Sequence, residues 1–392
     1  MFKKIISVLL IGILVFSFAA CGKKGEKKEK FSEELTVPEK KTAILVAPEA
    51  QYPEYYNAAK SIAEAYPDNI VVREYPDTRG VVTGTGIIDI SAEIAADPEF
   101  GAIIYAGATL YTTEAIKKAK SVNDSIITLA IEPEQSMGTV AENSDLVFCA
   151  DWEKYAKEII DTAKKMGAEY FVLYSYDRHV ANNPLYAQVK RYISVGCEEN
   201  DIKYIFQTVK DPVSVGINAA QYDLKSSLVA LFDNRKLESN NAVLFSTDPA
   251  VQPTLVELAE KYGMMYISPS FPTAYNGLCE YFDAKKPESM LDTEAYKNAL
   301  TEAIFKDSET KATYALYTYT MESTLVRGAV YTVFDMLSDP ELILPGLIDR
   351  ATLRLKDTAN VKKFTAEKYI GADNVIECYA PGFAILEYEE KK

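Results

Sequence analysis

Short apolar runs alternate with stretches of helical periodicity over most of the chain after residue 41. The runs are rich in β-branched and aromatic residues and are apolar at almost every position, which is typical of strands buried on both faces of a sheet. We predict strands at residues 42–48, 69–76, 101–107, 125–131, 145–151, 170–176, 202–209, 242–248 and 264–271. Helical spacing predicts helices at residues 55–66, 90–99, 112–120, 152–167, 184–200, 218–234 and 253–263. This alternation indicates an α/β protein with doubly wound parallel sheets.

The alternation stops near residue 151 and then starts again, so the chain contains two βα arrays in tandem. Two such arrays resemble the type I periplasmic-binding-protein fold, which is shared by sugar- and nucleoside-binding lipoproteins. The resemblance implies two Rossmann-like lobes joined by a hinge that the chain crosses three times. It places the first crossing near Ala150–Asp151 and the return near residues 311–320, which leads a helix at 322–337 back onto the first lobe.

The same resemblance implies the domain boundaries. Lobe 1 is expected to contain residues 42–150 and about 312–340, and lobe 2 residues 151–311 and about 341–392. Late strands are expected within residues 375–390. Residues 272–310 and 341–374 match the template least.

Two lysines and an apolar run open the chain, in the order of a secretory signal peptide. The run from Ile5 to Ala20 is shorter than the roughly 20 residues that a membrane-spanning helix needs. Two alanines then precede Cys21, and this sequence resembles the lipobox of bacterial lipoproteins. The resemblance implies a signal peptide at residues 1–20 and acylation of Cys21. The alternatives are an ordinary signal peptide with a chance cysteine, or an uncleaved anchor.

The segment that follows, residues 21–41, is dense in charge and has one aromatic residue, so it cannot bury enough surface to fold. We predict that it is a disordered tether. Two or more acyl chains hold a protein firmly at a membrane, whereas one does so only marginally. The predicted location is therefore the extracytoplasmic face of the cell membrane, with a lipid anchor at Cys21.

Three stretches are similar to a narrower group of bacterial lipoproteins, catalogued as a domain of unknown function. They are LYSYDRHVANNPLY (173–186), STDPAVQPTL (246–255) and SPSFPTAYNGL (268–278). This similarity supports the fold, but it implies no particular ligand.

The chain has 392 residues and a formal net charge of −15, which opposes binding to nucleic acid because phosphate contacts need basic patches. Cleavage of the signal peptide would make the chain still more acidic. The four cysteines after Cys21 are widely spaced and lack the CxxC pattern of zinc or redox sites. Buried free thiols are favoured, although their pairing stays open; the residues are Cys149, Cys197, Cys279 and Cys378.

The sequence lacks the signatures of several enzyme classes. One histidine excludes HExxH and multi-histidine metal sites, and neither a P-loop nor a GxSxG motif occurs. Gly84-Thr85-Gly86 has Asp89 where a dinucleotide fingerprint needs its third glycine. No pair of acids is singled out for glycosidase chemistry among the 57 acidic residues. We therefore predict a protein that is not an enzyme and that needs no cofactor or metal.

Candidate ligand-binding residues follow from a rule for α/β sheets, in which ligands bind beside the carboxyl ends of the strands. Arginine pairs with a carboxylate or a sugar hydroxyl, tyrosine rings stack on sugars or bases, and acids accept hydrogen bonds from hydroxyls or amines. The candidates of lobe 1 are Glu49, Tyr52, Tyr55, Tyr111 and Glu132, and those of lobe 2 are Asp177, Arg178 and Asp248, with Tyr319 on the hinge side. Further residues at strand ends are Gln51, Thr109, Tyr176, His179, Gln252, Phe271 and Glu322.

Structural roles compete with binding at several of these positions. The stretch 176–184 is equally explained by a solvated capping loop in which Arg178 bonds Asp177 or the backbone. Asp248 precedes Pro249 and can cap the next helix. A structural role is favoured for His179, and at least one tyrosine near residue 55 is expected in the core.

The leading hypothesis is a lipid-anchored, extracytoplasmic solute-binding protein that captures a small polar ligand between its lobes for an ABC-type transporter. The expected partners are therefore this ligand, the membrane through Cys21, and an ABC permease, with no nucleic acid. A ligand sensor for a membrane receptor is an alternative from the same fold. A surface hydrolase is the third hypothesis and has the weakest support.

Overall fold

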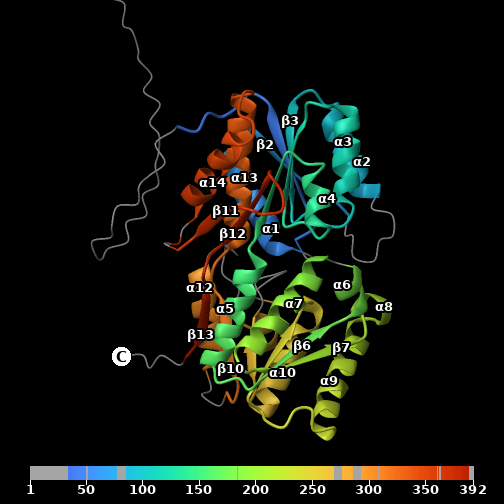
Figure 1. Ribbon diagram of the computed structural model, residues 1–392, viewed down its shortest axis with the longest axis vertical. Helices are drawn as coiled ribbons and strands as arrows, with labels where there is room; N and C mark the ends of the chain where they lie inside the picture. The colour runs from blue at the N-terminus through green and yellow to red at the C-terminus, as the bar shows by residue number, and fades with distance from the viewer. Residues whose placement is uncertain are drawn as a thin grey trace, which may run out of the picture. The chain divides into compact units, whose positions relative to one another are not determined.

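Two β-sheets with helices on both faces form the fold (Figure 1). The computed structural model describes residues 34–49, 52–76, 85–182, 184–268, 276–285, 293–306, 310–359, 361 and 363–387. Residues 1–33 lie outside this range, so the predicted signal peptide, the acylation of Cys21 and most of the tether stay predictions. In the described part, no helix combines the length and the apolar character that crossing a bilayer requires.

The sheet of lobe 1 has seven strands in the order β11-β12-β5-β4-β3-β1-β2. Their bounds are β1 Lys41–Val46, β2 Ile70–Glu74, β3 Phe100–Ala106, β4 Ile127–Ile131, β5 Leu146–Ala150, β11 Thr365–Lys368 and β12 Val375–Tyr379. All neighbours pair in parallel except β11 with β12. Strand β3 is buried at every position, which explains its unbroken apolar sequence.

Helices cover both faces of this sheet (Figure 1). One layer contains α1 (Pro53–Ala65), α13 (Met321–Ser338) and α14 (Gly346–Thr358), and the other contains α2 (Thr85–Ala96), α3 (Thr112–Val122) and α4 (Met137–Ala141). Helix α13 is buried over most of its surface because the sheet, α1 and α14 all pack on it. Gly328 permits the contact with α14, since a Cβ atom there would lie 2.6 Å from Leu355 Cδ2.

The sheet of lobe 2 has six strands in the order β13-β10-β9-β8-β6-β7. Their bounds are β6 Tyr170–Ser175, β7 Lys203–Thr208, β8 Ala242–Ser246, β9 Met265–Ile267, β10 Thr313–Tyr317 and β13 Phe383–Leu386. Among the described strands of this sheet, β13 alone runs antiparallel to its neighbour. The helices are α5 (Trp152–Lys165), α6 (Asp177–Asn182), α7 (Pro184–Glu199), α8 (Pro212–Val215), α9 (Ile217–Asp233), η1 (Pro249–Val251), α10 (Gln252–Tyr262), α11 (Asn276–Phe282) and α12 (Thr293–Ile304). Helices α5 and α7 pack on each other, as do α9, α10 and α11.

Within the described residues, the chain passes between the lobes at three places. The first is Asp151, between β5 and α5; the second is residues 318–320, between β10 and α13; the third is residues 380–382, between β12 and β13. The order of predicted strands and helices thus yields the expected α/β fold with two mostly parallel sheets, and this prediction is confirmed.

The predicted assignment of residues 341–392 to lobe 2 is wrong for most of that segment. Helix α14 packs on α13, and β12 adds to the edge of the lobe 1 sheet in parallel with β5. Among the described residues of this segment, β13 alone reaches the lobe 2 sheet. Conversely β10, which was expected in lobe 1, is a strand of lobe 2. The physical reason is that β5 leaves an open edge in lobe 1, which the hairpin of β11 and β12 fills.

Candidate functional site

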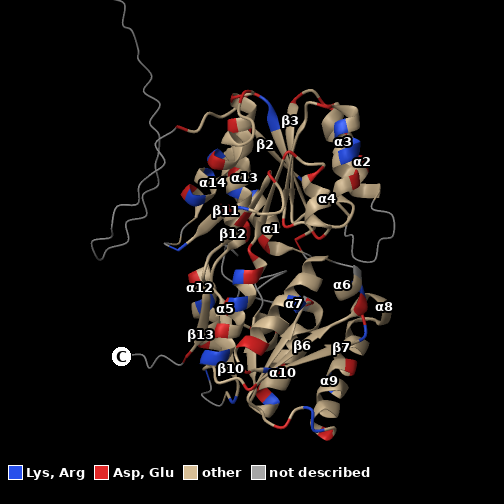
Figure 2. Cartoon of the chain, viewed as in Figure 1, with Lys and Arg blue, Asp and Glu red and all other residues tan. Residues whose placement is uncertain are grey.

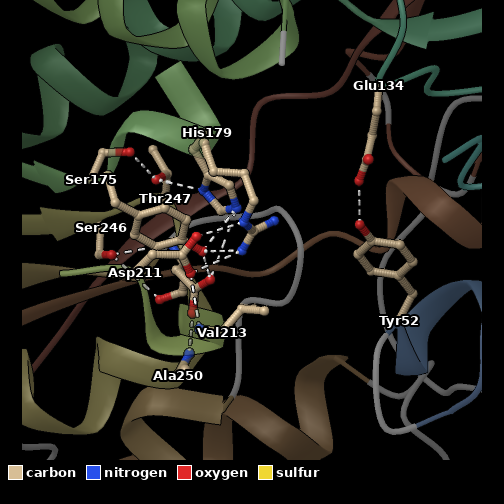
Figure 3. Close-up of polar contacts among 12 residues, drawn as sticks. Tyr52, Glu134, Ser175, His179, Asp211, Val213, Ser246, Thr247 and Ala250 are labelled. Carbon is tan, nitrogen blue, oxygen red and sulfur yellow. Dashed lines mark hydrogen bonds and ion pairs between the residues drawn. The ribbon is translucent and has the colours of Figure 1, made fainter. Parts of the chain in front are cut away.

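A network of polar side chains gathers where β6 and β8 end in lobe 2 (Figure 3). The Tyr176 hydroxyl donates a hydrogen bond to Asp248 Oδ2. His179 Nε2 lies 2.9 Å from the Tyr176 oxygen, and His179 Nδ1 lies 3.1 Å from Thr247 Oγ1. Since the Tyr176 proton goes to Asp248, the arrangement fits a neutral imidazole that donates from Nε2 and accepts at Nδ1.

His179 is buried within this network and packs against aromatic rings. Its ring stacks on Tyr186, with centroids 4.2 Å apart and planes inclined by 10°. Burial, with the nearby Arg178 charge, lowers the pKa of His179 to about 3. The imidazole is therefore neutral at physiological pH and braces the loop after β6.

Arg178 is anchored by Asp211, which follows β7. Its Nε donates to Asp211 Oδ2 at 2.7 Å, and a second nitrogen donates to Oδ1 at 3.3 Å. Asp211 also caps α8 by accepting from the Val213 N–H at 2.9 Å. Burial opposes the charge of Asp211, but the hydrogen bond from Arg178 prevails and lowers the pKa of the carboxyl. The Arg178 side chain stays 34% exposed, so part of the guanidinium is open to solvent.

A second polar pair belongs to lobe 1. Tyr52, which precedes α1, donates its hydroxyl proton to Glu134, three residues past the end of β4 (Figure 3). Burial raises the pKa of Glu134, and the Tyr52 hydrogen bond opposes this rise. The charge of Arg178 also opposes part of this rise, so the lobe 2 guanidinium acts electrostatically on the lobe 1 carboxylate.

Glu134 was not among the candidates from the sequence, which named Glu132 instead. Glu132 has a φ of 49°, so the chain turns into the left-handed region directly after β4. Its carboxylate points back into the protein and accepts hydrogen bonds from the Ala150 N–H and from Trp152 Nε1, the latter at 3.2 Å. The sequence contains both acids, and no signal in it distinguishes the inward one from the outward one.

A small pocket lies where the first two crossings meet the lobes. Its volume is about 20 Å³. Tyr55 and Glu132, both candidates from the sequence, lie in its wall together with Glu322. Burial raises the pKa of Glu132 to about 7. Burial and the neighbouring Glu54 raise the pKa of Glu322 well above its usual range.

The other candidates have more ordinary surroundings. Glu49 is exposed and accepts from Asn57 Nδ2 at 3.2 Å. Asp177 is exposed at the first position of α6, a short helix in a stretch that was expected to be a loop. Tyr111 precedes α3 with a φ of 73°. Tyr319 lies in the second crossing, where its hydroxyl bonds Thr324.

Asp248 has the capping role weighed for it from the sequence, since Oδ1 accepts the Ala250 N–H at 2.7 Å, and its Oδ2 accepts from Tyr176. Gln51 and Phe271 lie outside the described residues. The structure thus brings Arg178 and Asp248 together through Tyr176, which bonds both, and pairs Tyr52 with Glu134. Binding by any of these residues stays a prediction.

The family model described as "Protein of unknown function (DUF3798)" matches residues 41–312. Among curated proteins, one described as "Uncharacterized protein" from Treponema pallidum (strain Nichols) is 26% identical over 121 residues, which is 31% of this chain and 54% of that protein. The chain therefore spans about half the length of this curated relative.

Solved structures share the fold at low sequence identity. A "Putative transcriptional regulator" from Clostridium difficile 630 has a TM-score of 0.69 and 14% identity, over 89% of this chain and 100% of that one. A periplasmic ribose ABC transporter protein from Conexibacter woesei has a TM-score of 0.50 and 12% identity, over 77% of this chain and 87% of that one. AraP, an arabinose-binding protein from Geobacillus stearothermophilus, has a TM-score of 0.50 and 11% identity, over 87% and 97%. These similarities confirm the type I periplasmic-binding-protein-like fold.

Proposed function

The chain belongs to the family described as "Protein of unknown function (DUF3798)", and we propose that it is an extracytoplasmic solute-binding protein. In this proposal it captures a small polar molecule between its two lobes and delivers it to an ABC-type permease. Acylated Cys21 holds the chain at the outer face of the membrane. The role is one of binding, without catalysis.

One observation carries the proposal: polar side chains at the strand ends of the two sheets come within electrostatic reach of one another. Arg178 follows β6 in lobe 2 and Glu134 follows β4 in lobe 1. Burial raises the pKa of Glu134, and the charge of Arg178 opposes part of that rise. Ligands of open α/β sheets bind beside such strand ends. A molecule placed there would meet the tyrosine–glutamate pair of one lobe and the arginine of the other.

The three crossings supply a mechanism for capture. A ligand that contacts both lobes stabilises the closed arrangement relative to the open one, in proportion to its differential affinity for the two. The lobe 2 network holds its side chains ready for this step, because Asp211 and Tyr176 both bond Arg178 before a ligand arrives. Preorganisation of this kind lowers the entropic cost of binding.

Thermal unfolding of the full chain with a panel of small solutes tests the proposal. The panel includes ribose and arabinose, because a ribose ABC transporter protein and an arabinose-binding protein share the fold. A bound solute stabilises the native state by about 2.7 kcal/mol at a hundredfold excess over its Kd. We expect at least one solute to raise the unfolding temperature, and Arg178→Ala to reduce that shift.

Arg73→Ala is the matched control, because Arg73 also forms an ion pair, with Glu93 at 3.0 Å, on the surface of lobe 1. If the ligand-induced rise in unfolding temperature is as large in the Arg178→Ala variant as in the Arg73→Ala variant, the proposed site is contradicted. The anchor is tested separately by fractionating cells that produce the Cys21→Ala variant. We expect the variant to leave the membrane fraction, and retention there would contradict acylation of Cys21.

A further inference from the structure

The small pocket near the crossings, here called the hinge pocket, is lined by both lobes. Lobe 1 contributes Tyr55, Glu132 and Glu322, and lobe 2 contributes Trp152 and Tyr155 of α5 with Tyr317 of β10. A group bound in the hinge pocket therefore touches elements of both lobes. It also lies close to the polar pair of lobe 1, because Tyr55 follows Tyr52 by three positions along the chain.

The hinge pocket holds two buried carboxyl groups and no positive side chain in its wall. Glu132 is 4% exposed and Glu322 is 7% exposed. No lysine, arginine or histidine is among the described residues that line the hinge pocket. Lys154, one turn into α5, is engaged by Asp151 at 2.9 Å and Glu367 at 3.5 Å.

Buried carboxylates without a counter-charge are costly, by several kcal/mol per ion. Glu132 accepts hydrogen bonds from a backbone N–H and an indole N–H, which are both neutral donors. Figure 2 shows acidic residues near α1 and β12, and the basic Lys154 at the start of α5 is already paired with Asp151 and Glu367. The hinge pocket is therefore suited to a cation that arrives from outside the chain.

Aromatic rings complete the wall. Trp152 and Tyr155 meet edge to face, with centroids 5.1 Å apart and planes at 88°. Tyr155 and Tyr317 do the same at 5.7 Å and 86°. Ring faces attract cations, and organic ammonium groups most characteristically bind where several rings surround them. The described residues hold no group of three or more histidines, cysteines or acids that could ligate a metal ion, so the arrangement favours an organic cation.

The size of the hinge pocket limits the cation further. A volume of about 20 Å³ is enough for roughly one water-sized group. A primary ammonium head, –NH₃⁺, has that size and three N–H donors, whereas a trimethylammonium head is far larger. Two carboxylates can accept N–H donors while the rings face the remaining charge.

We propose that the hinge pocket binds the ammonium head of a primary amine, and that the captured solute is a small primary ammonium compound. The inference rests on the proposed solute-binding function and narrows its solute class. Glu132 and Glu322 accept hydrogen bonds from the ammonium group, and Tyr55, Tyr155 and Tyr317 enclose it. Because both lobes supply these groups, binding of the ammonium head favours closure.

Trp152 is the only tryptophan of the chain, so its fluorescence reports directly on the hinge pocket. The experiment titrates the full chain, in mild detergent at pH 7.5, with n-propylammonium chloride. Parallel titrations use 1-propanol as the neutral probe of similar size, potassium chloride at equal ionic strength, and tetramethylammonium chloride. We expect a saturable change in emission with propylammonium and no saturable change with the other three.

Glu322→Gln should raise the apparent Kd for propylammonium about tenfold or more, the usual effect of losing a charged hydrogen bond. Glu132→Gln is the second variant with the same expectation, and it decides the matter if Glu322→Gln fails to fold. The matched control is Glu153→Gln, an exposed acid beside Trp152 that does not line the hinge pocket. It should leave the apparent Kd within about twofold.

Several outcomes overturn the inference. They are an equal response to 1-propanol, an equal response to potassium or tetramethylammonium, or equal affinities in the Glu322→Gln and Glu153→Gln variants. In one outcome, a neutral sugar raises the unfolding temperature in a way that depends on Arg178, and the ammonium probes give no fluorescence response. This outcome overturns the inference and leaves the proposed function intact. If no solute gives a response in either assay, both the inference and the proposed function are overturned.

Discussion

The indole Nε1 of Trp152 donates a hydrogen bond to Glu132 Oε2 at 3.2 Å, across the first crossing between the lobes. This contact joins the first residue of α5 to the end of β4, so the charge of the carboxyl acts directly on the indole. Burial raises the pKa of Glu132 to about 7 from its ordinary value of 4.5. The emission of Trp152 is therefore expected to titrate with a midpoint near pH 7.

Glu132→Gln should remove that transition, and Glu153→Gln should keep it. Glu377, whose pKa burial also raises to about 7, is a second titrating group nearby, and the Glu132 variant separates the two. The sign for stability follows from the raised pKa: the contribution of neutral Glu132 is complete below pH 4.5 and is lost as the pH rises to about 7. Emission of Glu132→Gln that still titrates like the wild type would show that Glu132 is not the group involved.

A buried ion pair joins α13 to α14. Arg354 Nε donates to Asp335 Oδ2 at 2.7 Å, and a second nitrogen donates to Oδ1 at 2.6 Å, with Arg354 only 3% exposed. Arg354→Leu leaves the buried Asp335 with the more distant Arg350, at 3.7 Å. We expect a loss of about 3 kcal/mol in the free energy of unfolding, measured with urea.

The double variant Asp335→Leu/Arg354→Leu should cost less than Arg354→Leu alone, because no uncompensated charge stays buried. If the double variant is less stable than Arg354→Leu, this explanation is wrong. The ion pair would then stabilise the native state by itself, beyond keeping Asp335 from being buried without a partner.

Gly107 sits where β3 ends, with a φ of 65°, and a Cβ atom there would lie 2.9 Å from Tyr55 Cδ2. Gly107→Ala should therefore destabilise the chain by about 1–2 kcal/mol, through backbone strain in the left-handed region. It should also displace Tyr55 and alter the response of Trp152 to propylammonium. Gly138→Ala in α4 is the control, since nothing lies within 4 Å of its added Cβ. Equal unfolding temperatures for the two variants would refute the steric argument.

His179 gives the chain a dependence of stability on acid pH. Its folded pKa of about 3 lies below its ordinary value of 6.5, so the contribution of the neutral ring is complete above pH 6.5 and is lost as the pH falls toward 3. One proton contributes about 1.4 kcal/mol per pH unit to the slope of the free energy of unfolding. His179→Gln should lower that slope by up to this amount, as measured by urea unfolding between pH 6.5 and 4. Parallel curves for the variant and the wild type would mean that the ring does not titrate on unfolding.

Much of the fold was predictable because its strands are buried on both faces. Runs such as residues 101–107 and 170–176 are apolar without interruption, and the structure has strands at Phe100–Ala106 and Tyr170–Ser175. The lobe of the last 50 residues was not predictable in the same way. A short edge strand such as β12 can pair with any open edge of suitable direction, and its own sequence does not say which edge is free.

The candidate site shows the same division. The rule of strand ends selected the loops that contain Tyr52, Arg178 and Asp248, which the structure places in polar contacts. Ligand binding by these residues stays a prediction. The same rule selected Glu132 and not Glu134. It uses only the distance of a residue from the strand end, and that distance does not reveal where the side chain points. A single left-handed residue after β4 reverses that direction.

The sequence alone determined the order of strands and helices, the two βα arrays, the negative net charge and the expectation of an acylated N-terminus. Each of these depends only on local pattern or composition. Tertiary structure decided which lobe receives the late strands, which acid turns inward, and that two buried carboxylates share a small aromatic-walled pocket. Those outcomes depend on contacts between segments far apart in the chain, such as Glu132 with Trp152 and Glu322 with Glu54. No local pattern encodes such contacts, because each is settled only when the sheets and helices pack.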